Sequence, residues 1–421
     1  TSYQQVVLEG RLRSSLIHIN PQLPPEAVDQ VIRRVTAPET PQLLENNRIF
    51  HRFLSNGVAI EYRDQDETRY GLAWLLDFDH PENNDWLAVN QFRVEQDQYH
   101  RRPDVVIFVN GLPLAIIELK NPADENASLK GAWNQIQTYR HDIAPIFDFN
   151  AVTVISDGVP SAAMSSFAGA FEHYAPWKTI DGRDVVTDRP SLEVLIRGVF
   201  EPKRFLDILR NFVVFSDETI TDKGTGQPMR SLVKRVSKYH QYWAVNTAVE
   251  STVRAASPEG DKRGGVVWHT QGSGKSFEMV FYAAKIMRDP RMENPTLVFI
   301  TDRNDLDDQL FGETFSPATI LPEKPVQAEN RAHLRDLLTR VSGGIIFTTL
   351  QKFAPEAVAD TNPVLTDRRN VIVVADEAHR SQYGFGETLD SEGRLKAGLA
   401  KHMRDALPGA TCLGFTGTPI E

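Results

Sequence analysis

The sequence lacks the features of disulfide-stabilised and membrane-spanning proteins. Its 421 residues include a single cysteine, Cys412, so an intramolecular disulfide framework cannot form. No apolar run approaches the roughly 18 residues that a membrane-spanning helix requires. The first residues lack the basic flank and apolar core of a secretory signal. We therefore expect a soluble, cytoplasmic protein.

The chain also lacks an excess of basic residues. Lys and Arg number 46 and Asp and Glu number 56, which gives a formal net charge of −10. Binding along a nucleic-acid backbone requires a local excess of Lys and Arg, so here it would need a basic cleft on an acidic body. The basic clusters at residues 101–102, 203–204 and 230–238 are candidates for such a surface. An ordinary solvated surface explains each cluster equally well.

The pattern of apolar residues predicts two α/β regions. Helical periodicity over residues 3–60 precedes strand-like runs at residues 74–78, 104–109, 114–119 and 151–155. After a turn-rich stretch, strands alternate with helices, which is typical of a parallel α/β domain. The strands predicted in this second region are residues 297–300, 344–348 and 371–375. We place the first domain at residues 1–220, a linker at 221–231 and the second domain at 232–421.

A glycine loop opens the second region. Residues 266–268 predict a buried strand, residues 269–276 read HTQGSGKS, and residues 277–287 predict a helix, which is the context that a P-loop requires. Glycines let backbone N–H groups approach phosphate oxygens, and the start of the helix adds positive partial charge. Lys275 would contact the β- and γ-phosphates, and Ser276 would hold Mg²⁺. The residues predicted to bind ATP in this loop are Gly272, Ser273, Gly274, Lys275 and Ser276.

Two acidic residues complete this predicted ATP site. Residues 370–375 predict a buried strand that ends at Asp376 and Glu377. An acidic residue at the carboxyl end of such a strand contacts the bound Mg²⁺, and Glu377 is positioned to polarise the attacking water. The glycine loop lies about 100 residues upstream, so the two elements together predict ATP and Mg²⁺ as cofactors.

A second set of charged residues lies in the first region. Asp104 opens an apolar strand, residues 110–111 are the Asn-Gly signal of a hairpin, and the return strand ends with Glu118 and Lys120. Glu118 and Lys120 are two residues apart and share one face of the strand. Asp…Glu-x-Lys is the PD-(D/E)xK nuclease pattern, in which the carboxylates and the Leu119 carbonyl would bind Mg²⁺. Lys120 would orient the attacking water and offset negative charge. A strand with solvated charged ends is the alternative interpretation.

Shared metal binding sets a condition on this hairpin. A two-residue loop at 110–111 pairs residues whose numbers sum to an odd value, which puts Asp104 and Glu118 on opposite faces. We therefore predict a loop of three or five residues, or a β-bulge, with Gly111 at positive φ. Asp77 and Asp79 are the candidates for a further upstream acidic residue of the site.

A predicted helix follows the charged hairpin. It covers residues 132–142 and carries Gln135 and Tyr139 four residues apart on one face. Gln-x-x-x-Tyr at this spacing resembles the helix beside the active site of RecB-like nucleases, which makes both residues supporting members of the predicted nuclease site.

The motifs of the second region resemble the first RecA-like lobe of superfamily 2 helicases and translocases. The stretches that carry this resemblance are residues 300–303, 348–351, 376–379 and 414–419. The resemblance implies that Thr301, Arg303, Thr349 and Gln351 face the DNA backbone. It also implies that His379, Thr416 and Thr418 couple the nucleotide site to DNA movement. Residues 238–241 resemble the adenine-reading glutamine element, with Gln241 on the base, although an ordinary surface glutamine fits equally well.

The two regions together resemble the R subunit of type I restriction enzymes. Similar stretches are residues 43–48, 89–92, 118–122, 268–276 and 376–381. The implied fold is a PD-(D/E)xK (restriction-endonuclease-like) domain followed by one RecA-like parallel α/β domain. The implied activity is ATP-dependent translocation and Mg²⁺-dependent cleavage of double-stranded DNA, with methyltransferase (M) and specificity (S) subunits as partners. His269 departs from the general P-loop but suits this family's version.

The sequence ends at Glu421 without a second RecA-like lobe. The arginines of that lobe complete the ATP site in the family that the chain resembles. We therefore expect a fragment that binds nucleotide weakly and is nearly inactive as an ATPase or motor. Robust DNA-stimulated ATP turnover by the 421-residue chain would contradict this expectation.

Two other functions remain open at this point. A stand-alone nuclease-helicase of DNA repair would act without M and S subunits, so co-purification with them separates the two. A non-catalytic, ATP-gated DNA-binding module would be favoured if Asp104→Ala or Lys120→Ala cleaved as well as wild type. A type III restriction subunit is disfavoured because its nuclease follows its motor.

Overall fold

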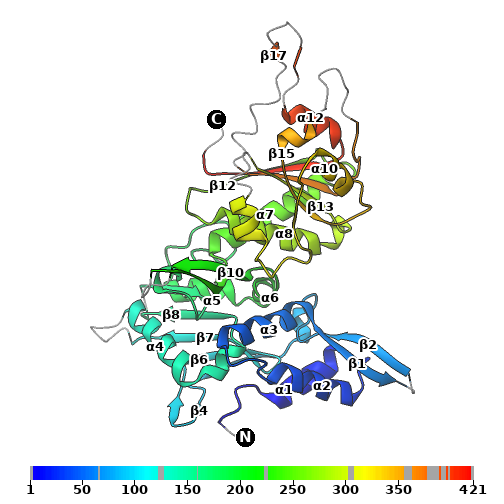
Figure 1. Cartoon of the computed structure of the whole chain (residues 1–421). Helices are drawn as coiled ribbons and strands as arrows, with labels where there is room; N and C mark the ends of the chain where they lie inside the picture. Colours follow the sequence, from blue (N-terminus) through cyan, green and yellow to red (C-terminus); the bar gives the residue numbers. More distant parts are fainter. Residues whose placement is uncertain are drawn as a thin grey trace. The chain divides into compact units, whose positions relative to one another are not determined.

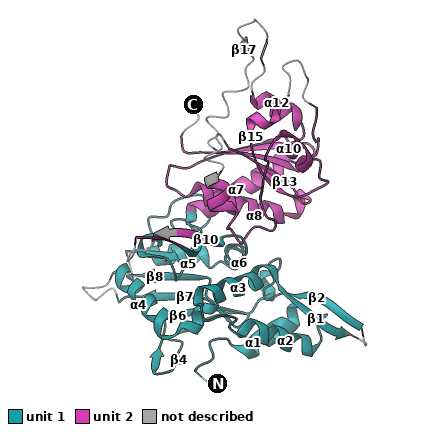
Figure 2. Cartoon of the chain, viewed as in Figure 1, with its two compact units in different colours: residues 1–215, 230–239 teal, residues 216–229, 240–421 magenta. Residues whose placement is uncertain are grey.

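The chain separates into two compact units in the computed structural model. The structure describes residues 3–64, 67–121, 128–158, 160–221, 226–301, 308–354, 363–376, 388–389, 395–396 and 399–418. The first unit comprises Thr1–Phe215 with Arg230–Tyr239, and the second comprises Ser216–Met229 with His240–Glu421 (Figure 2). Both units are mixed α/β structures. Among the described residues, no helix combines the length and the apolar character that a membrane span needs.

The first unit is built around a five-stranded mixed sheet in the order β3-β6-β7-β8-β9 (Figure 1). Its helices are α1 (Glu9–Ile19), α2 (Pro25–Thr36), α3 (Leu43–Asn56), α4 (Leu129–Asp142), α5 (Ser191–Val199) and α6 (Pro202–Asn211). Its strands are β1 (Val58–Asp64), β2 (Glu67–Ala73), β3 (Trp86–Asn90), β4 (Val94–Gln96), β5 (Tyr99–Arg101), β6 (Val105–Val109), β7 (Leu112–Leu119), β8 (Val152–Ser156) and β9 (Ala162–Ser165). Strands β7 and β8 run parallel and the other pairs of this sheet are antiparallel.

The centre of this sheet is apolar on both faces. Every residue of β8 is buried, and so is every residue of β7 except Leu119. Helix α4 packs against β7 and β8 and is capped by Ser128, whose side-chain oxygen accepts a hydrogen bond from the N–H of Gly131 at 3.1 Å. This cap satisfies an N–H group that has no partner within the helix. The helix that carries Gln135 and Tyr139 is thereby fixed beside the end of β7.

Of the alternatives expected for the hairpin, a longer loop or a β-bulge, the structure has the bulge. The loop has two residues, Asn110 and Gly111, because the flanking residues pair with each other, and both loop residues have positive φ, at 52° and 77°. Val109 pairs with Leu112 and Phe108 with Pro113, but the register then shifts and Ile107 pairs with Ala115. The unpaired residue is Leu114. Beyond the bulge, the numbers of paired residues sum to an even value, which brings Asp104 and Glu118 to the same face.

The prediction of a strand at residues 74–78 was wrong. Strand β2 ends at Ala73, and the irregular segment that follows buries Leu75 and Leu76. Side chains supply the hydrogen bonds that a strand partner would give. The side chain of Asn20 accepts from the N–H of Trp74 at 2.8 Å and donates to its carbonyl at 2.9 Å. Asn110 donates to the carbonyl of Leu75 at 2.8 Å.

A two-stranded sheet, β10 (Val213–Thr221) with β11 (Pro228–Val236), includes much of the stretch expected to be a linker. Lys234 of β11 explains why residues 230–239 group with the first unit. Its side chain is buried, and its Nζ donates to the carbonyl of Asn150 at 2.6 Å. The rings of Phe167 and Phe215 lie 5.1 and 5.5 Å from this nitrogen. Lys234 is therefore part of a core, and the idea that it belongs to an exposed basic surface was wrong.

The second unit contains a six-stranded parallel sheet in the order β12-β19-β16-β13-β15-β14. Its strands are β12 (Arg263–Trp268), β13 (Thr296–Thr301), β14 (Val326–Gln327), β15 (Ile345–Thr349), β16 (Val371–Ala375) and β19 (Thr411–Thr416), with the short pair β17 (Thr388–Leu389) and β18 (Leu395–Lys396) outside the sheet. Its helices include α7 (Tyr239–Ala255), α8 (Lys275–Arg288), α10 (Arg331–Leu338) and α12 (Leu399–Ala406). Parallel strands that alternate with helices agree with the predicted RecA-like fold.

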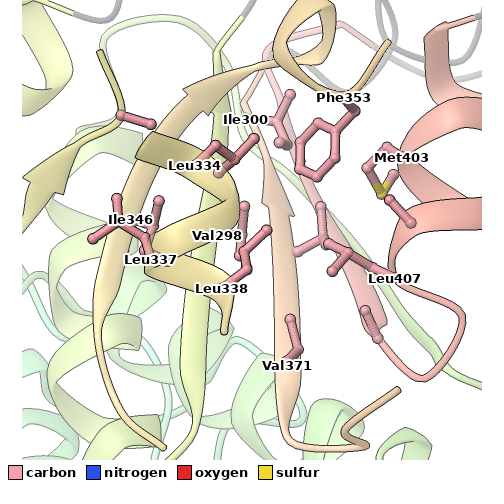
Figure 3. Close-up of a cluster of buried hydrophobic side chains, with 14 residues drawn as sticks. Val298, Ile300, Leu334, Leu337, Leu338, Ile346, Phe353, Val371, Met403 and Leu407 are labelled. Atoms are coloured by element: carbon pink, nitrogen blue, oxygen red, sulfur yellow. The ribbon is translucent and has the colours of Figure 1, made fainter. Parts of the chain in front are cut away.

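Apolar side chains from several helices cover one face of this sheet. Figure 3 shows Leu334 and Leu338 of α10 facing Val298 of β13, and Phe353 and Met403 belong to the same cluster. All of these side chains are buried. Their burial holds the sheet rigid, so its carboxyl edge can carry a precisely arranged site.

Candidate nuclease and nucleotide sites

Asp104, Glu118 and Lys120 come together at one end of the β6–β7 hairpin. Asp104 immediately precedes β6, and the bulged register continues to place it opposite Glu118. One carboxylate oxygen of Asp104 (Oδ2) accepts from the N–H of Leu119 at 2.8 Å. The Lys120 Nζ lies 3.2 Å from Oε1 of Glu118. The predicted acidic pair and its lysine therefore share one small region of the first unit.

Glu118 lies in an unusual environment for a carboxylate. Its side chain is buried, and its Oε2 has no hydrogen-bond partner among the residues that the structure describes. Burial and, to a lesser extent, the charge of Asp104 raise the pKa of Glu118 to about 7, although Lys120 and the Tyr139 hydroxyl act in the opposite direction. A buried carboxylate oxygen without a partner fits a site for a divalent cation, because an ion would supply the missing interaction.

Gln135 and Tyr139 of α4 face this site. The Tyr139 hydroxyl donates to the carbonyl of Arg102 at 3.3 Å, and its ring is buried. Burial and the nearby charge of Glu118 raise the pKa of Tyr139, whereas a hydrogen bond with Gln135 opposes the rise. The tyrosine is therefore a neutral hydrogen-bonding group near the acidic pair.

Gln91 contacts Asp104 and lies at this site, although its residue type gave no reason to expect it there. It has a φ of 51°, which is uncommon for a residue other than glycine. Its backbone N–H donates to the carbonyl of Asp104 at 2.9 Å, and its Nε2 donates to Asp104 Oδ1 at 2.8 Å. The only sequence signal was its place in residues 89–92, a stretch similar to the R-subunit family, and that signal does not indicate a contact.

Asp77 has a local role in its own loop. Its Oδ1 accepts from the N–H groups of Asp79 and His80 at 3.1 and 2.9 Å, and its Oδ2 accepts from Asn83 at 2.8 Å. These hydrogen bonds lower the pKa of Asp77 despite its partial burial. Its carboxylate therefore stabilises a turn, and these contacts give no support to Asp77 as the further upstream acid.

The glycine loop between β12 and α8 has the backbone of a phosphate cradle. Gly272 and Gly274 have φ values of 80° and 91°, where a side chain is strained. Lys275 Nζ lies 3.2 Å from the carbonyl oxygen of His269, which belongs to the loop itself. The Gln241 side chain is buried and its Nε2 donates to the carbonyls of Ser273 and Gly274, both at 3.3 Å. Gln241 thus contacts the loop directly.

The strand ends beside this loop carry the other predicted ATP-site residues. Strand β19 lies between β12 and β16, so the residues after all three strands meet at one edge of the sheet. Asp376 follows β16, and its N–H donates to the carbonyl of Ile300 at 3.0 Å. Thr416 ends β19, and its carbonyl accepts from the N–H of His269 at 3.2 Å. Ser276 lies half-buried in the first turn of α8.

The hydroxyls of Thr416 and Thr418 lie next to each other. Thr416 Oγ1 accepts from the N–H of Thr418 at 3.3 Å, and the two hydroxyl oxygens are 3.4 Å apart. A Cβ on the intervening Gly417 would lie 3.1 Å from Lys275 Nζ. This segment therefore approaches the lysine of the glycine loop closely.

The residues predicted to face DNA lie at the ends of neighbouring strands. Thr301 of β13 and Thr349 of β15 are register partners, and both are buried. Gln351 is exposed two residues further along the chain. Of these three residues, Gln351 alone offers an exposed side chain. Arg303, Glu377 and His379 lie outside the described residues.

Comparisons with known sequences relate each of the two units to a protein family. Residues 1–169 match the family described as type I restriction enzyme R protein N terminus. Residues 240–421 match the SWI2/SNF2 ATPase family. Together with the two folds, these matches define a chain with a restriction-enzyme N-terminal domain and an SWI2/SNF2-type ATPase lobe.

Three similar proteins are all named endonuclease subunits of type I restriction enzymes. The type I restriction enzyme HindI endonuclease subunit of Haemophilus influenzae is 43% identical, over 99% of this chain and 39% of that protein. A Methanocaldococcus jannaschii protein, provisionally named type I restriction enzyme MjaIXP endonuclease subunit, is 33% identical over 100% of this chain and 39% of its own length. The SauCOLORF180P endonuclease subunit of Staphylococcus aureus is 28% identical over 90% of this chain and 36% of its own length. The chain belongs to the R-subunit family of type I restriction enzymes, and it spans about two fifths of the length of these relatives.

Proposed function

We propose that this chain carries the Mg²⁺-dependent nuclease site and the first half of the ATP site of a type I restriction enzyme, an ATP-dependent site-specific deoxyribonuclease. The buried, unpartnered Oε2 of Glu118, beside the carboxylate of Asp104, is the observation that carries the nuclease half. The names of the relatives support DNA restriction as the activity.

In the proposed nuclease site, Asp104 and Glu118 hold the metal. A bound Mg²⁺ lowers the pKa of a water and stabilises negative charge on the scissile phosphate. Lys120 orients the attacking water and offsets the charge that develops on the phosphate. Gln91 and the N–H of Leu119 each donate to one oxygen of Asp104, which holds that carboxylate in one orientation.

Tyr139 and Gln135 have a supporting role in this proposal. The pKa of Tyr139 is raised, so its hydroxyl keeps its proton and remains a hydrogen-bond donor beside Glu118 at neutral pH. Gln135, one turn earlier on α4, holds the hydroxyl in place.

In the proposed ATP site, the backbone N–H groups of residues 272–274 and the start of α8 bind the phosphates. Lys275 exchanges its contact with the His269 carbonyl for the β- and γ-phosphates. Ser276 and Asp376 hold Mg²⁺, and Glu377 polarises the attacking water.

We propose double-stranded DNA, the M subunit and the S subunit as partners, in the cytoplasm. Of the four residues expected at the DNA backbone, Arg303 and Gln351 would contact it beyond the carboxyl ends of β13 and β15, whereas the side chains of Thr301 and Thr349 are buried at those ends. His379, Thr416 and Thr418 would link ATP hydrolysis to movement along DNA, which agrees with the approach of Gly417 to Lys275.

The nuclease site and the ATP site can be tested separately by measuring both DNA cleavage and ATP hydrolysis. The measurements use the enzyme assembled with its M and S subunits. Asp104→Asn should abolish plasmid cleavage and leave DNA-stimulated ATP hydrolysis near the wild-type rate. Lys275→Ala should abolish both, because cleavage at a distance depends on the motor. Asp181→Asn, in an exposed loop, is the matched control for Asp104. Undiminished cleavage by Asp104→Asn would contradict the nuclease assignment.

A further inference from the structure

A cluster of nitrogen and oxygen donors lies beside the glycine loop. It comprises His240 near the start of α7, His269 directly after β12, and Glu278 in α8. One donor atom from each residue lies within 4.8 Å of the donors from the other two. Glu278 Oε1 is 2.7 Å from His269 Nδ1 and 4.0 Å from His240 Nε2. None of these three side chains has a role in the ATP site proposed above.

The negative charge of the Glu278 carboxylate has few partners. Its side chain has no exposed surface, and Oε2 has no hydrogen-bond partner among the described residues. The ion-pair contacts recorded for Glu278 within the described part of the chain come from the two histidines, and none comes from a lysine or arginine. Burying a carboxylate is costly unless its oxygens are hydrogen-bonded or coordinate a cation. The environment of Glu278 therefore favours an additional positive charge.

We propose that His240, His269 and Glu278 bind one divalent transition-metal ion of the Zn²⁺ class. Two imidazole nitrogens and one carboxylate oxygen are a ligand set that suits zinc and leaves a fourth position open. Zinc ligands in a tetrahedral site are about 3.3 Å apart, given bond lengths of about 2.0 to 2.1 Å. The distances from Glu278 Oε1 to the two histidine nitrogens, 2.7 and 4.0 Å, lie on either side of this value. The ligands can therefore reach an ion through small side-chain movements.

The site is accessible and is distinct from the Mg²⁺ site of the nucleotide. The side chains of His240 and His269 are 27% and 25% exposed, which gives an ion an entry route to the buried carboxylate. In this structure, His240 Nε2 also lies 3.2 Å from the carbonyl oxygen of Ser273. An ion bound by His240 takes the nitrogen that makes this contact with the glycine loop. Mg²⁺ prefers oxygen ligands and competes poorly for imidazole.

Titration with Co²⁺ and Zn²⁺ tests the site directly. The chain is prepared without a histidine tag and in the Asp104→Asn background, which weakens binding at the nuclease site. Co²⁺ bound to imidazole absorbs visible light, and we expect saturation at one ion per chain, displacement by Zn²⁺ and resistance to an excess of Mg²⁺. His240→Ala and Glu278→Gln should each weaken binding by at least about tenfold, as loss of even an outer-shell partner does. His18→Ala, which removes an exposed histidine of α1, should not change it.

Two results would overturn the proposal. One is the absence of saturable binding at one ion per chain. The other is binding that is unchanged in His240→Ala, which would locate the ion elsewhere. Circular dichroism of the metal-free variants checks their folding. Because His240 is only half-buried, its variant remains a valid test if Glu278→Gln does not fold. The experiment does not depend on nuclease or ATPase activity, so its failure leaves the proposed function standing.

Discussion

Gln91 Nε2 lies 2.8 Å from Oδ1 of Asp104, and the backbone N–H of Gln91 donates to the carbonyl of the same residue. Gln91 adopts a left-handed backbone conformation, which costs roughly 1 to 2 kcal/mol for a residue with a side chain. Two hydrogen bonds to one residue offset that cost. Strained residues that persist in a fold cluster at functional sites, and here the strain aims an amide at a predicted metal ligand.

Replacing Gln91 by Ala should weaken metal use by the nuclease. Without the amide, Asp104 Oδ1 loses its donor, and the carboxylate can rotate away from the geometry that a metal needs. We expect the Mg²⁺ concentration for half-maximal cleavage to rise by about tenfold, the effect typical of an outer-shell partner. Gln98→Ala, an exposed glutamine nearby in the sequence, is the matched control. An unchanged Mg²⁺ requirement would mean that Gln91 only shapes its turn.

Glu118→Gln should stabilise the metal-free protein at high pH. The pKa of Glu118 is raised to about 7 in the folded chain. The stability that the protonated carboxyl contributes is therefore complete below its ordinary pKa of about 4.5, and it is lost as the pH rises through about 7. Glutamine has no charge to bury, so at about pH 8 the variant should be more stable by on the order of 3 kcal/mol.

Chemical unfolding in the presence of a chelator measures this difference. At about pH 4.5 wild type and Glu118→Gln should unfold at nearly the same denaturant concentration, and at about pH 8 the variant should unfold later. Glu193→Gln, at a half-buried glutamate of α5 that pairs with Arg189, should show no such pH-dependent gain. If Glu118→Gln were less stable than wild type at the higher pH, the buried carboxylate would be stabilising, contrary to its environment.

Mg²⁺ binding at the nuclease site should depend on pH in the same range. A proton and a metal ion compete for Glu118, whose pKa is about 7 without metal. Below this pH, affinity should fall by about tenfold for each pH unit, and above it affinity should level off. Calorimetric titrations between about pH 6 and pH 8 would measure the slope. A flat profile would show that Glu118 is not a ligand.

The sequence alone predicted the parts of the site that follow from the spacing of apolar residues and from the rule that decides which hairpin residues share a face. The requirement that Asp104 and Glu118 share a face predicted a longer loop or a bulge, and the register shift after Ile107 is the bulge. The segment that starts at Trp74 was misjudged because β propensity does not reveal that the side chain of Asn20 replaces a strand partner. Gln91 could not be predicted either, because a left-handed backbone at a glutamine has no sequence signature.

The two glycines of the phosphate loop face different surroundings. A Cβ at Gly272 would meet no atom within 4 Å, whereas a Cβ at Gly274 would lie 2.6 Å from Gln241 Nε2. Both residues have positive φ, so an alanine at either position is strained by roughly 1 to 2 kcal/mol. Only Gly274→Ala also displaces a buried glutamine that donates to the loop carbonyls.

Gly274→Ala should therefore weaken nucleotide binding more than Gly272→Ala. The binding of a fluorescent ATP analogue, measured for both variants and for Gln241→Ala, gives the comparison. In the double variant Gln241→Ala/Gly274→Ala the steric conflict is absent, so the loss of affinity should be smaller than the sum of the two single losses. Strictly additive losses would indicate that Gln241 and Gly274 act independently, and the contact between them would then not shape the loop. Equal losses for the two glycine variants would show that backbone strain alone governs nucleotide binding there.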